Sequence, residues 1–107
     1  MPVRYVLTTL KPSVNPADYE RWLREYDYRV AKTLPSIMSY RTHRIDGAIT
    51  GAEGAGWNYI ERIEVRDVEQ YQKDLASSAG QELIRQLYEH YLDRSKTIYF
   101  WSEPIED

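Results

Sequence analysis

The chain has 107 residues, and its 14 Lys and Arg against 17 Asp and Glu give a formal net charge of −3 at pH 7. Its 42% hydrophobic and 29% charged content is that of a folded globular protein, which excludes a disordered, collagen-like or coiled-coil chain and predicts one domain over residues 1–107. The absence of cysteine excludes disulfides, zinc–thiolate sites and cysteine nucleophiles.

Charge and hydropathy patterning also narrow the partners and the location. The negative net charge disfavours nucleic-acid binding. The longest uncharged stretch, residues 33–40, is far shorter than the roughly 20 apolar residues of a membrane span. The first residues lack the pattern of a signal peptide. We therefore expect a cytoplasmic protein that binds neither nucleic acid nor membrane.

The aromatic residues are unusual in kind, with ten Tyr and three Trp but a single Phe. Tyr and Trp carry a polar group on a large ring, so they suit surfaces that are half buried and half wet. The composition indicates a ligand cavity or a subunit interface, or else a core rich in tyrosine.

The first third of the chain predicts a strand followed by a helix. Residues 2–10 are rich in β-branched and aromatic residues, which is typical of a strand. Asn15 offers a helix N-cap and Pro16 a proline in the first turn, and the helix is expected to run to about Thr33 and to end before Pro35. Its predicted buried face follows steps of three and four residues: Tyr19, Trp22, Leu23, Tyr26, Val30 and Leu34.

Two further strands and a glycine-rich loop are predicted next. Residues 36–45 alternate loosely and predict a second strand. Residues 47–56 hold four of the five glycines and predict a mobile hairpin loop. Residues 57–65 predict a third strand, in which Tyr59 and Glu61 share one face.

The last third predicts two helices and a strand. Asp67 with Gln70, and Ser78 with Gln81, have the spacing of capping boxes. The first box predicts a short helix, and the second predicts a longer helix with the apolar face Leu83, Ile84, Leu87, Tyr88 and Tyr91. Residues 97–101 predict a final strand.

The element order is therefore β-α-β-β-α-β, which predicts an α+β fold of the ferredoxin-like kind, an antiparallel sheet with helices on one face. The first and last strands have apolar residues on both faces, for example Val6 and Leu7 in the first and Tyr99 and Phe100 in the last. Helices cover one face only, so we expect a second copy of the chain to cover the other face, in a homodimer that packs sheet on sheet.

Only two histidines are present, His43 and His90, and their spacing matches no metal-ligand motif, so we expect no metal site. His43 is a chemically reasonable general base because imidazole titrates near neutrality. The alternative is an exposed histidine between Arg41 and Arg44.

Asp27 and Glu61 are the candidate carboxylates. Asp27 falls next to Tyr26 at the edge of the predicted buried helix face, where burial raises a carboxyl pKa and makes the group a usable acid or base. The alternative is an exposed residue that pairs with an arginine. Glu61 shares a strand face with apolar residues, so it either points into an apolar layer or pairs with an arginine at the rim of an interface.

Other motifs give weaker signals. The loop at residues 47–56 lacks the Gly-Lys-Ser/Thr end of a P-loop, and no Gly-x-Ser-x-Gly nucleophile motif occurs. Trp57 and Tyr59 fall where RNA-recognition modules of this element order stack bases, but Glu61 and Glu64 beside them oppose phosphate binding.

Two segments resemble a known superfamily: residues 18–40, with Leu34-Pro-Ser-Ile37, and residues 59–65, which end in Ile63-Glu-Val65. They resemble the dimeric α+β barrel superfamily and, within it, the RedY-like proteins of prodiginine and bisindole pigment pathways, over nearly the whole chain. Related EthD-like members have a histidine eight residues before the proline of Leu-Pro, where this chain has Asp27.

The resemblance implies a ligand site between the helices and the sheet, and a homodimer that packs sheet on sheet. It also implies activity without metal or flavin, as a cyclase, dehydratase, isomerase or cofactor-free oxygenase that acts on aromatic or polyketide intermediates.

We therefore expect a cofactor-independent tailoring enzyme of aromatic natural-product biosynthesis, which promotes cyclisation or dehydration of a small pyrrolic or indolic substrate. Asp27 exchanges a proton with a substrate N–H or leaving hydroxyl, and His43, or Glu61 in its place, is the second acid–base group. The expected substrate-binding residues are Trp22, Tyr26, Tyr59, Trp101 and Tyr5. The alternatives are a cofactor-free or haem-dependent monooxygenase, with His90 as an axial ligand, and a non-catalytic protein that holds a reactive intermediate.

Overall fold

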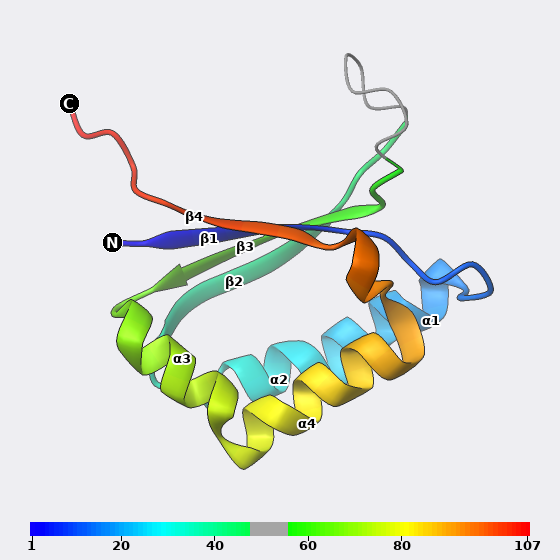
Figure 1. Cartoon of the computed structure of the whole chain (residues 1–107), viewed down its shortest axis with the longest axis horizontal. Coiled ribbons are helices and arrows are strands. Elements are labelled where there is room, and N and C mark those ends of the chain that lie inside the picture. The colour runs from blue at the N-terminus through cyan, green and yellow to red at the C-terminus, as the bar shows by residue number, and fades with distance from the viewer. Residues whose placement is uncertain (48–55) are drawn as a thin grey trace.

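The structure, a computed structural model, describes residues 1–47 and 56–107, so most of the loop predicted at residues 47–56 lies outside the described residues. A single four-stranded sheet lies on one side of the molecule and the helices lie together on the other (Figure 1). The strands are β1 (Val3–Thr8), β2 (Ile37–Arg44), β3 (Tyr59–Val65) and β4 (Ile98–Ser102). Their order is β2-β3-β1-β4, and all neighbours are antiparallel. The predicted ferredoxin-like α+β fold is confirmed.

The first helical segment is built from three consecutive parts: α1 (Pro16–Trp22), a π-helical turn (Leu23–Asp27) and α2 (Tyr28–Ala31). As predicted, the Asn15 side chain caps its start and accepts a hydrogen bond from the Ala17 N–H at 2.9 Å.

The π-helical turn changes which residues the helix buries. Asp27 and Ala31, only 3% and 4% exposed, are buried with Leu23, whereas Tyr26 and Val30 of the predicted face are half-buried. A π-helical turn holds more than four residues, so residues four apart stay on one face instead of drifting around the helix. The predicted spacing assumed a regular α-helix: it holds in part at Tyr26, which packs half-buried against the core, and it missed the burial of Asp27 and Ala31.

The remaining helical elements are α3 (Val68–Ala76), α4 (Ser78–Gln86), a second π-helical turn (Leu87–Tyr91) and a 3-10 turn (Arg94–Lys96). Asp67 caps α3 and accepts from the Gln70 N–H at 3.0 Å, as predicted. The cap of α4 is Ser77 and not the predicted Ser78. Ser77 has extended backbone angles, and its hydroxyl accepts from the Gly80 N–H at 3.2 Å, whereas Ser78 is already helical.

The register of the sheet decides which side chains face the helices, because residues paired across neighbouring strands point to the same face. Two rows of paired residues lie on the helix-covered face: Thr42, Glu61, Val6 and Tyr99 in one, and Tyr40, Ile63, Arg4 and Trp101 in the other. Tyr71 of α3 contacts Arg4 and Trp101, which fixes the side on which these rows lie.

The opposite face carries the alternate residues and no described helix covers it (Figure 1). Its two rows are Arg41, Arg62, Tyr5 and Phe100, and His43, Ile60, Leu7 and Ile98. Ile98 and Phe100 are 46% and 48% exposed on this open face. Among residues 1–47 and 56–107, no helix has the length and apolar character needed to cross a membrane.

Candidate active site

Two carboxyl side chains are buried between the helices and the sheet. Asp27 ends the first π-helical turn and is 3% exposed, and Glu61 lies at the middle of β3 and is 7% exposed. An internal π-helical turn is frequently found at a functional site, because the extra residue re-aims a side chain. Charged groups are seldom buried without a partner, so Asp27 and Glu61 must each be either hydrogen-bonded or uncharged.

Tyr40 of β2 joins the two carboxyls. Its hydroxyl lies 2.5 Å from Asp27 Oδ2 and 3.0 Å from Glu61 Oε1, and Thr42 Oγ1 donates a hydrogen bond to the same hydroxyl at 3.2 Å. We call Asp27, Tyr40 and Glu61 the carboxyl–tyrosine cluster. Its members come from the helix, the edge strand and a central strand, so only the folded chain brings them together.

Burial shifts the acidity of both carboxyls toward neutrality. The pKa of Asp27 is raised to about 7, first by burial and then by the nearby charge of Glu61, while the hydrogen bond from Tyr40 opposes the rise. The pKa of Glu61 is raised to about 6 by burial, against the opposing effects of Tyr40 and Arg4. Groups that titrate near pH 7 exchange protons readily under physiological conditions.

The Tyr40 hydroxyl can form hydrogen bonds to both carboxyls only if one of the two carboxyls carries a proton. A tyrosine hydroxyl has one hydrogen, so it donates to one carboxylate only. The other carboxyl must be protonated to complete its contact with Tyr40, and it then donates to the hydroxyl oxygen. Both pKa values are raised toward neutrality, and the geometry fits a pair that holds one acid and one base, joined through Tyr40.

Arg4 of β1 is the nearby cation. Its Nη1 donates to the Tyr71 hydroxyl at 2.9 Å, and its guanidinium carbon lies 4.4 Å from the ring centre of Tyr99, with the rings of Tyr71 and Trp101 at 5.6 and 6.0 Å. Arg4 pairs in register with Ile63, two residues from Glu61 along β3, so Arg4 and Glu61 are diagonal neighbours on the helix-covered face.

Several buried polar atoms around the cluster have no hydrogen-bond partner among the described residues: Tyr19 Oη, Thr8 Oγ1 and Arg4 Nε. Tyr19 and Thr8 are both fully buried, and the charges of Glu61 and Asp27, after burial itself, raise the pKa of Tyr19. Buried polar atoms are nearly always hydrogen-bonded in folded proteins, so these atoms indicate an interior that receives water or a polar ligand.

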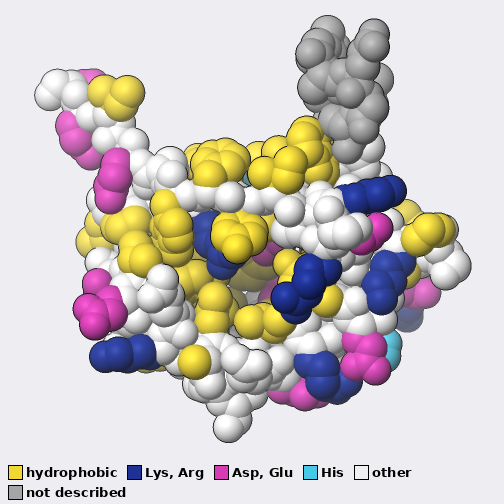
Figure 2. Space-filling view, viewed as in Figure 1, with side chains coloured by type: hydrophobic (Ala, Val, Ile, Leu, Met, Phe, Trp, Pro, Cys, Tyr) yellow, Lys and Arg dark blue, Asp and Glu magenta, His cyan; other side chains and the backbone are white. Residues whose placement is uncertain are grey.

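Figure 2 shows that one face of the molecule is hollowed between the sheet and the helices. Hydrophobic side chains surround the hollow, and basic and acidic side chains are both visible at it. A concave site with an apolar wall and a few charged groups is the usual form of a small-molecule site.

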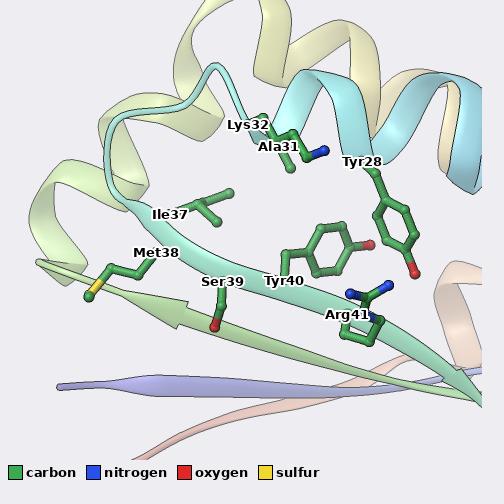
Figure 3. A pocket seen from close by; sticks show the side chains of 8 residues that line it. All are labelled: Tyr28, Ala31, Lys32, Ile37, Met38, Ser39, Tyr40 and Arg41. Carbon is green, nitrogen blue, oxygen red and sulfur yellow. The ribbon is translucent and has the colours of Figure 1, made fainter.

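A second opening lies at the edge of the sheet, between α2 and β2. This cleft has a volume of about 310 Å3, and Figure 3 shows Tyr28 of α2 and Tyr40 of β2 approaching one another across it, with Arg41 beside them. The two tyrosine rings meet edge to face at 5.3 Å. The ring of Tyr40 thus lines the cleft while its hydroxyl reaches the carboxyls.

His43 and Tyr5 lie on the open face of the sheet, away from Asp27. His43 is exposed and lies at the rim of an outer groove with Arg24 and Asp46. Successive side chains of a strand point to opposite faces, and Tyr40 and Thr42 take the inner one. Within the chain, the expected pairing of Asp27 with His43 is therefore not formed, and Glu61 is the group that the fold places beside Asp27.

Apart from Tyr5, the aromatic residues expected to bind the substrate lie on the side of the sheet that the helices cover, but they do not line one common cavity. Trp22 is buried where the helices meet, with its Nε1–H on Gln86 Oε1, and Tyr26 lines a shallow outer groove beside it. Tyr59 is buried against Tyr19 and donates to Glu20. Trp101 lies near Arg4 on the helix-covered face.

His90 is exposed on the second π-helical turn. Within the part of the chain that the structure describes, no three His, Asp or Glu side chains form a group able to hold a metal ion.

Sequence reasoning missed Tyr40, Thr42 and Arg4. The alternation of the second strand contained the signal for the first two, because Tyr40 and Thr42 share a parity opposite to that of His43. A β-bulge between Ile37 and Ser39 blurred this alternation in the sequence.

The sequence matches the family of the REDY-like protein HapK over residues 2–105. The chain belongs to this family. The resemblance found in the sequence is thereby confirmed, although no curated protein sequence matches the chain.

Solved structures agree with the fold. HapK from Hahella chejuensis is similar with a TM-score of 0.79 at 18% identity, over 100% of this chain and 95% of that chain. Hydroxynitrile lyase from Passiflora edulis is similar with a TM-score of 0.76 at 10% identity, over 99% and 95%. A ferredoxin-like protein of unknown function from Thermobifida fusca, described as dimeric, has a TM-score of 0.72 at 10% identity, over 97% and 92%. These likenesses show the fold.

Proposed function

We propose that this member of the family is an enzyme that performs cofactor-independent acid–base chemistry on a small pyrrolic or indolic molecule of natural-product biosynthesis. The observation that carries the proposal is the carboxyl–tyrosine cluster, in which the Tyr40 hydroxyl contacts both Asp27 and Glu61 while the Tyr40 ring lines the cleft between α2 and β2. The similarity to a hydroxynitrile lyase supports a lyase-type reaction by analogy of fold.

The reaction that fits this pair is loss of water, with or without ring closure. Protonated Asp27 gives its proton to a leaving hydroxyl, and the C–O bond breaks to release water. Ionised Glu61 takes a proton from the adjacent C–H or ring N–H, and the electron pair of that bond forms the new double bond. Tyr40 then passes the proton from Glu61 back to Asp27, which restores the starting state.

The direct test is incubation of the protein with candidate hydroxylated pyrroles and indoles, followed by mass spectrometry for loss of one water or for an isomeric cyclised product. Turnover is expected in the wild type and in His43→Ala, and it is expected to be lost in Asp27→Asn and Glu61→Gln. Full activity in Asp27→Asn would contradict the proposal. Tight binding without turnover in the wild type would favour the intermediate-binding protein instead.

We also propose a homodimer in which the open faces of two sheets pack together. Tyr5, Leu7, Ile98 and Phe100 give this face its apolar character, and neighbours of the same fold are described as dimeric. His43 lies on the same face, so a dimer would bury it between the subunits rather than in the hollow.

A further inference from the structure

Arg4 lies beside the carboxyl–tyrosine cluster, where its charge lowers the pKa of its diagonal neighbour Glu61 without forming a direct ion pair. None of the ion pairs formed within residues 1–47 and 56–107 involves it. Its Nη1 is used by the Tyr71 hydroxyl, while its buried Nε has no partner there. Arg4 is only half-buried, but a buried N–H donor without a partner is costly, which indicates that the Nε–H has a partner when the protein functions.

The surroundings of Arg4 define what it can bind. The rings of Tyr71, Tyr99 and Trp101 lie around the half-buried guanidinium; Tyr71 is buried, and the other two rings are exposed. A guanidinium is a planar fork of N–H donors that matches the two oxygens of a carboxylate, and this match is strongest where water is excluded. The rings also offer flat surfaces to an aromatic ligand.

The position of Arg4 relative to Glu61 decides where a bound ligand lies. Arg4 and Glu61 are diagonal neighbours on the helix-covered face of the sheet. A ligand held at one end by the Arg4 guanidinium would therefore lie beside the carboxyl pair.

We propose that Arg4 binds a carboxylate of the substrate, so that the substrate is a small planar aromatic acid whose ring reaches Glu61 and Asp27. This inference rests on the proposed function, since it names the substrate class for the same site. Arg4 is in this view a binding residue that orients the ring, and the proton transfers remain with the carboxyls.

The test compares indole-2-carboxylate with neutral indole-2-carboxamide by calorimetric titration at pH 6.5. The two probes have nearly the same shape, so the difference in affinity reports the charge. We expect the carboxylate to bind at least about tenfold tighter to the wild type, as a charge-assisted hydrogen bond to a half-buried guanidinium predicts. The preference is expected to fall below about twofold in Arg4→Gln and to persist in part in Arg4→Lys.

Two controls keep the result specific. Arg29→Gln removes an exposed arginine of α2 and should keep the full preference. In the wild type, the 15N resonance of the Arg4 Nε–H should shift on addition of the carboxylate and not of the carboxamide, a readout that does not depend on the folding of a variant.

Equal affinity of the two probes for the wild type, or a preference that survives in Arg4→Gln, would overturn the inference. Asp27→Asn separates it from the proposed function, because this variant should keep the carboxylate preference and lose turnover. Turnover that persists in Asp27→Asn while Arg4 still selects the carboxylate would reject the acid–base mechanism alone.

Discussion

The Tyr40 hydroxyl lies 2.5 Å from Asp27 Oδ2 and bridges this carboxyl to Glu61, 3.0 Å away on β3. Since the hydroxyl has one hydrogen, the contact is complete only when one of the two carboxyls is protonated. The geometry and the raised pKa values therefore describe the same state, a pair that holds one proton near neutral pH.

Replacing Tyr40 by Phe should raise the pKa of the carboxyl that is ionised when the pair holds one proton. The Tyr40 hydroxyl donates its single hydrogen to that carboxylate and favours its ionised form, and the variant removes this hydrogen bond while keeping the ring. Titration of the side-chain carboxyl carbons by 13C NMR measures both values. Tyr26→Phe, on the outer groove, is the matched control and should leave them unchanged. A lower pKa in Tyr40→Phe would show that the bridge does not exist in solution.

Folding stability should fall as pH rises through the pKa of Asp27. Its pKa is raised from 3.8 to about 7 in the folded state, so its contribution to stability is full below about pH 4 and is lost as pH passes 7. Relative to Asp27→Asn, the wild type should lose about 2 to 3 kcal/mol of unfolding free energy between pH 5 and pH 8.

Urea unfolding at the two pH values measures this difference, and Asp107→Asn, at an exposed position, should show none of it. A stability difference that stays constant with pH would mean that Asp27 titrates normally in the folded protein.

The cap of α4 gives a test of the local structure. Ser77→Ala removes the hydroxyl that accepts from Gly80 and should cost about 1 kcal/mol of unfolding free energy. Ser78→Ala, one residue further and inside the helix, should cost much less because alanine is a good helix former. Chemical denaturation of both variants checks the assignment, and the reverse ranking would restore Ser78 as the cap.

Self-association should depend on the open face of the sheet. Phe100→Lys places a charge among Tyr5, Leu7 and Ile98 and should convert the proposed dimer to a monomer. Ile105→Lys is the control, since Ile105 is 99% exposed and lies beyond the last strand. Sedimentation velocity distinguishes the two states. A Phe100→Lys protein that remains dimeric would place the interface elsewhere.

The sequence predicted the element order well because its signals are local. Asn15 with Pro16 and Asp67 with Gln70 determine where helices begin, since a cap depends on residues only a few positions apart. The period-two alternation of β3 likewise placed Glu61 on one strand face with Tyr59 and Ile63, but left open whether that face points to the helices or to the rim of an interface.

Two local irregularities explain why the side-chain orientations were predicted less well than the elements. The π-helical turn buries Asp27, which was expected at the edge of the buried face, and leaves Tyr26 half-buried. The bulge in β2 shifts the alternation of the strand, so the sequence did not show that Tyr40 and His43 point to opposite faces. Neither feature has a dependable signature in residue spacing, because both are stabilised by contacts with other elements.

The sequence by itself therefore determined the ferredoxin-like fold and the two carboxyl groups, Asp27 and Glu61, that stand out as candidates. Only the tertiary structure decided that these groups share a proton through Tyr40 and lie beside Arg4. The physical reason is that β2, β3 and β1 meet through sheet register, which joins residues distant in the chain and which no local pattern encodes.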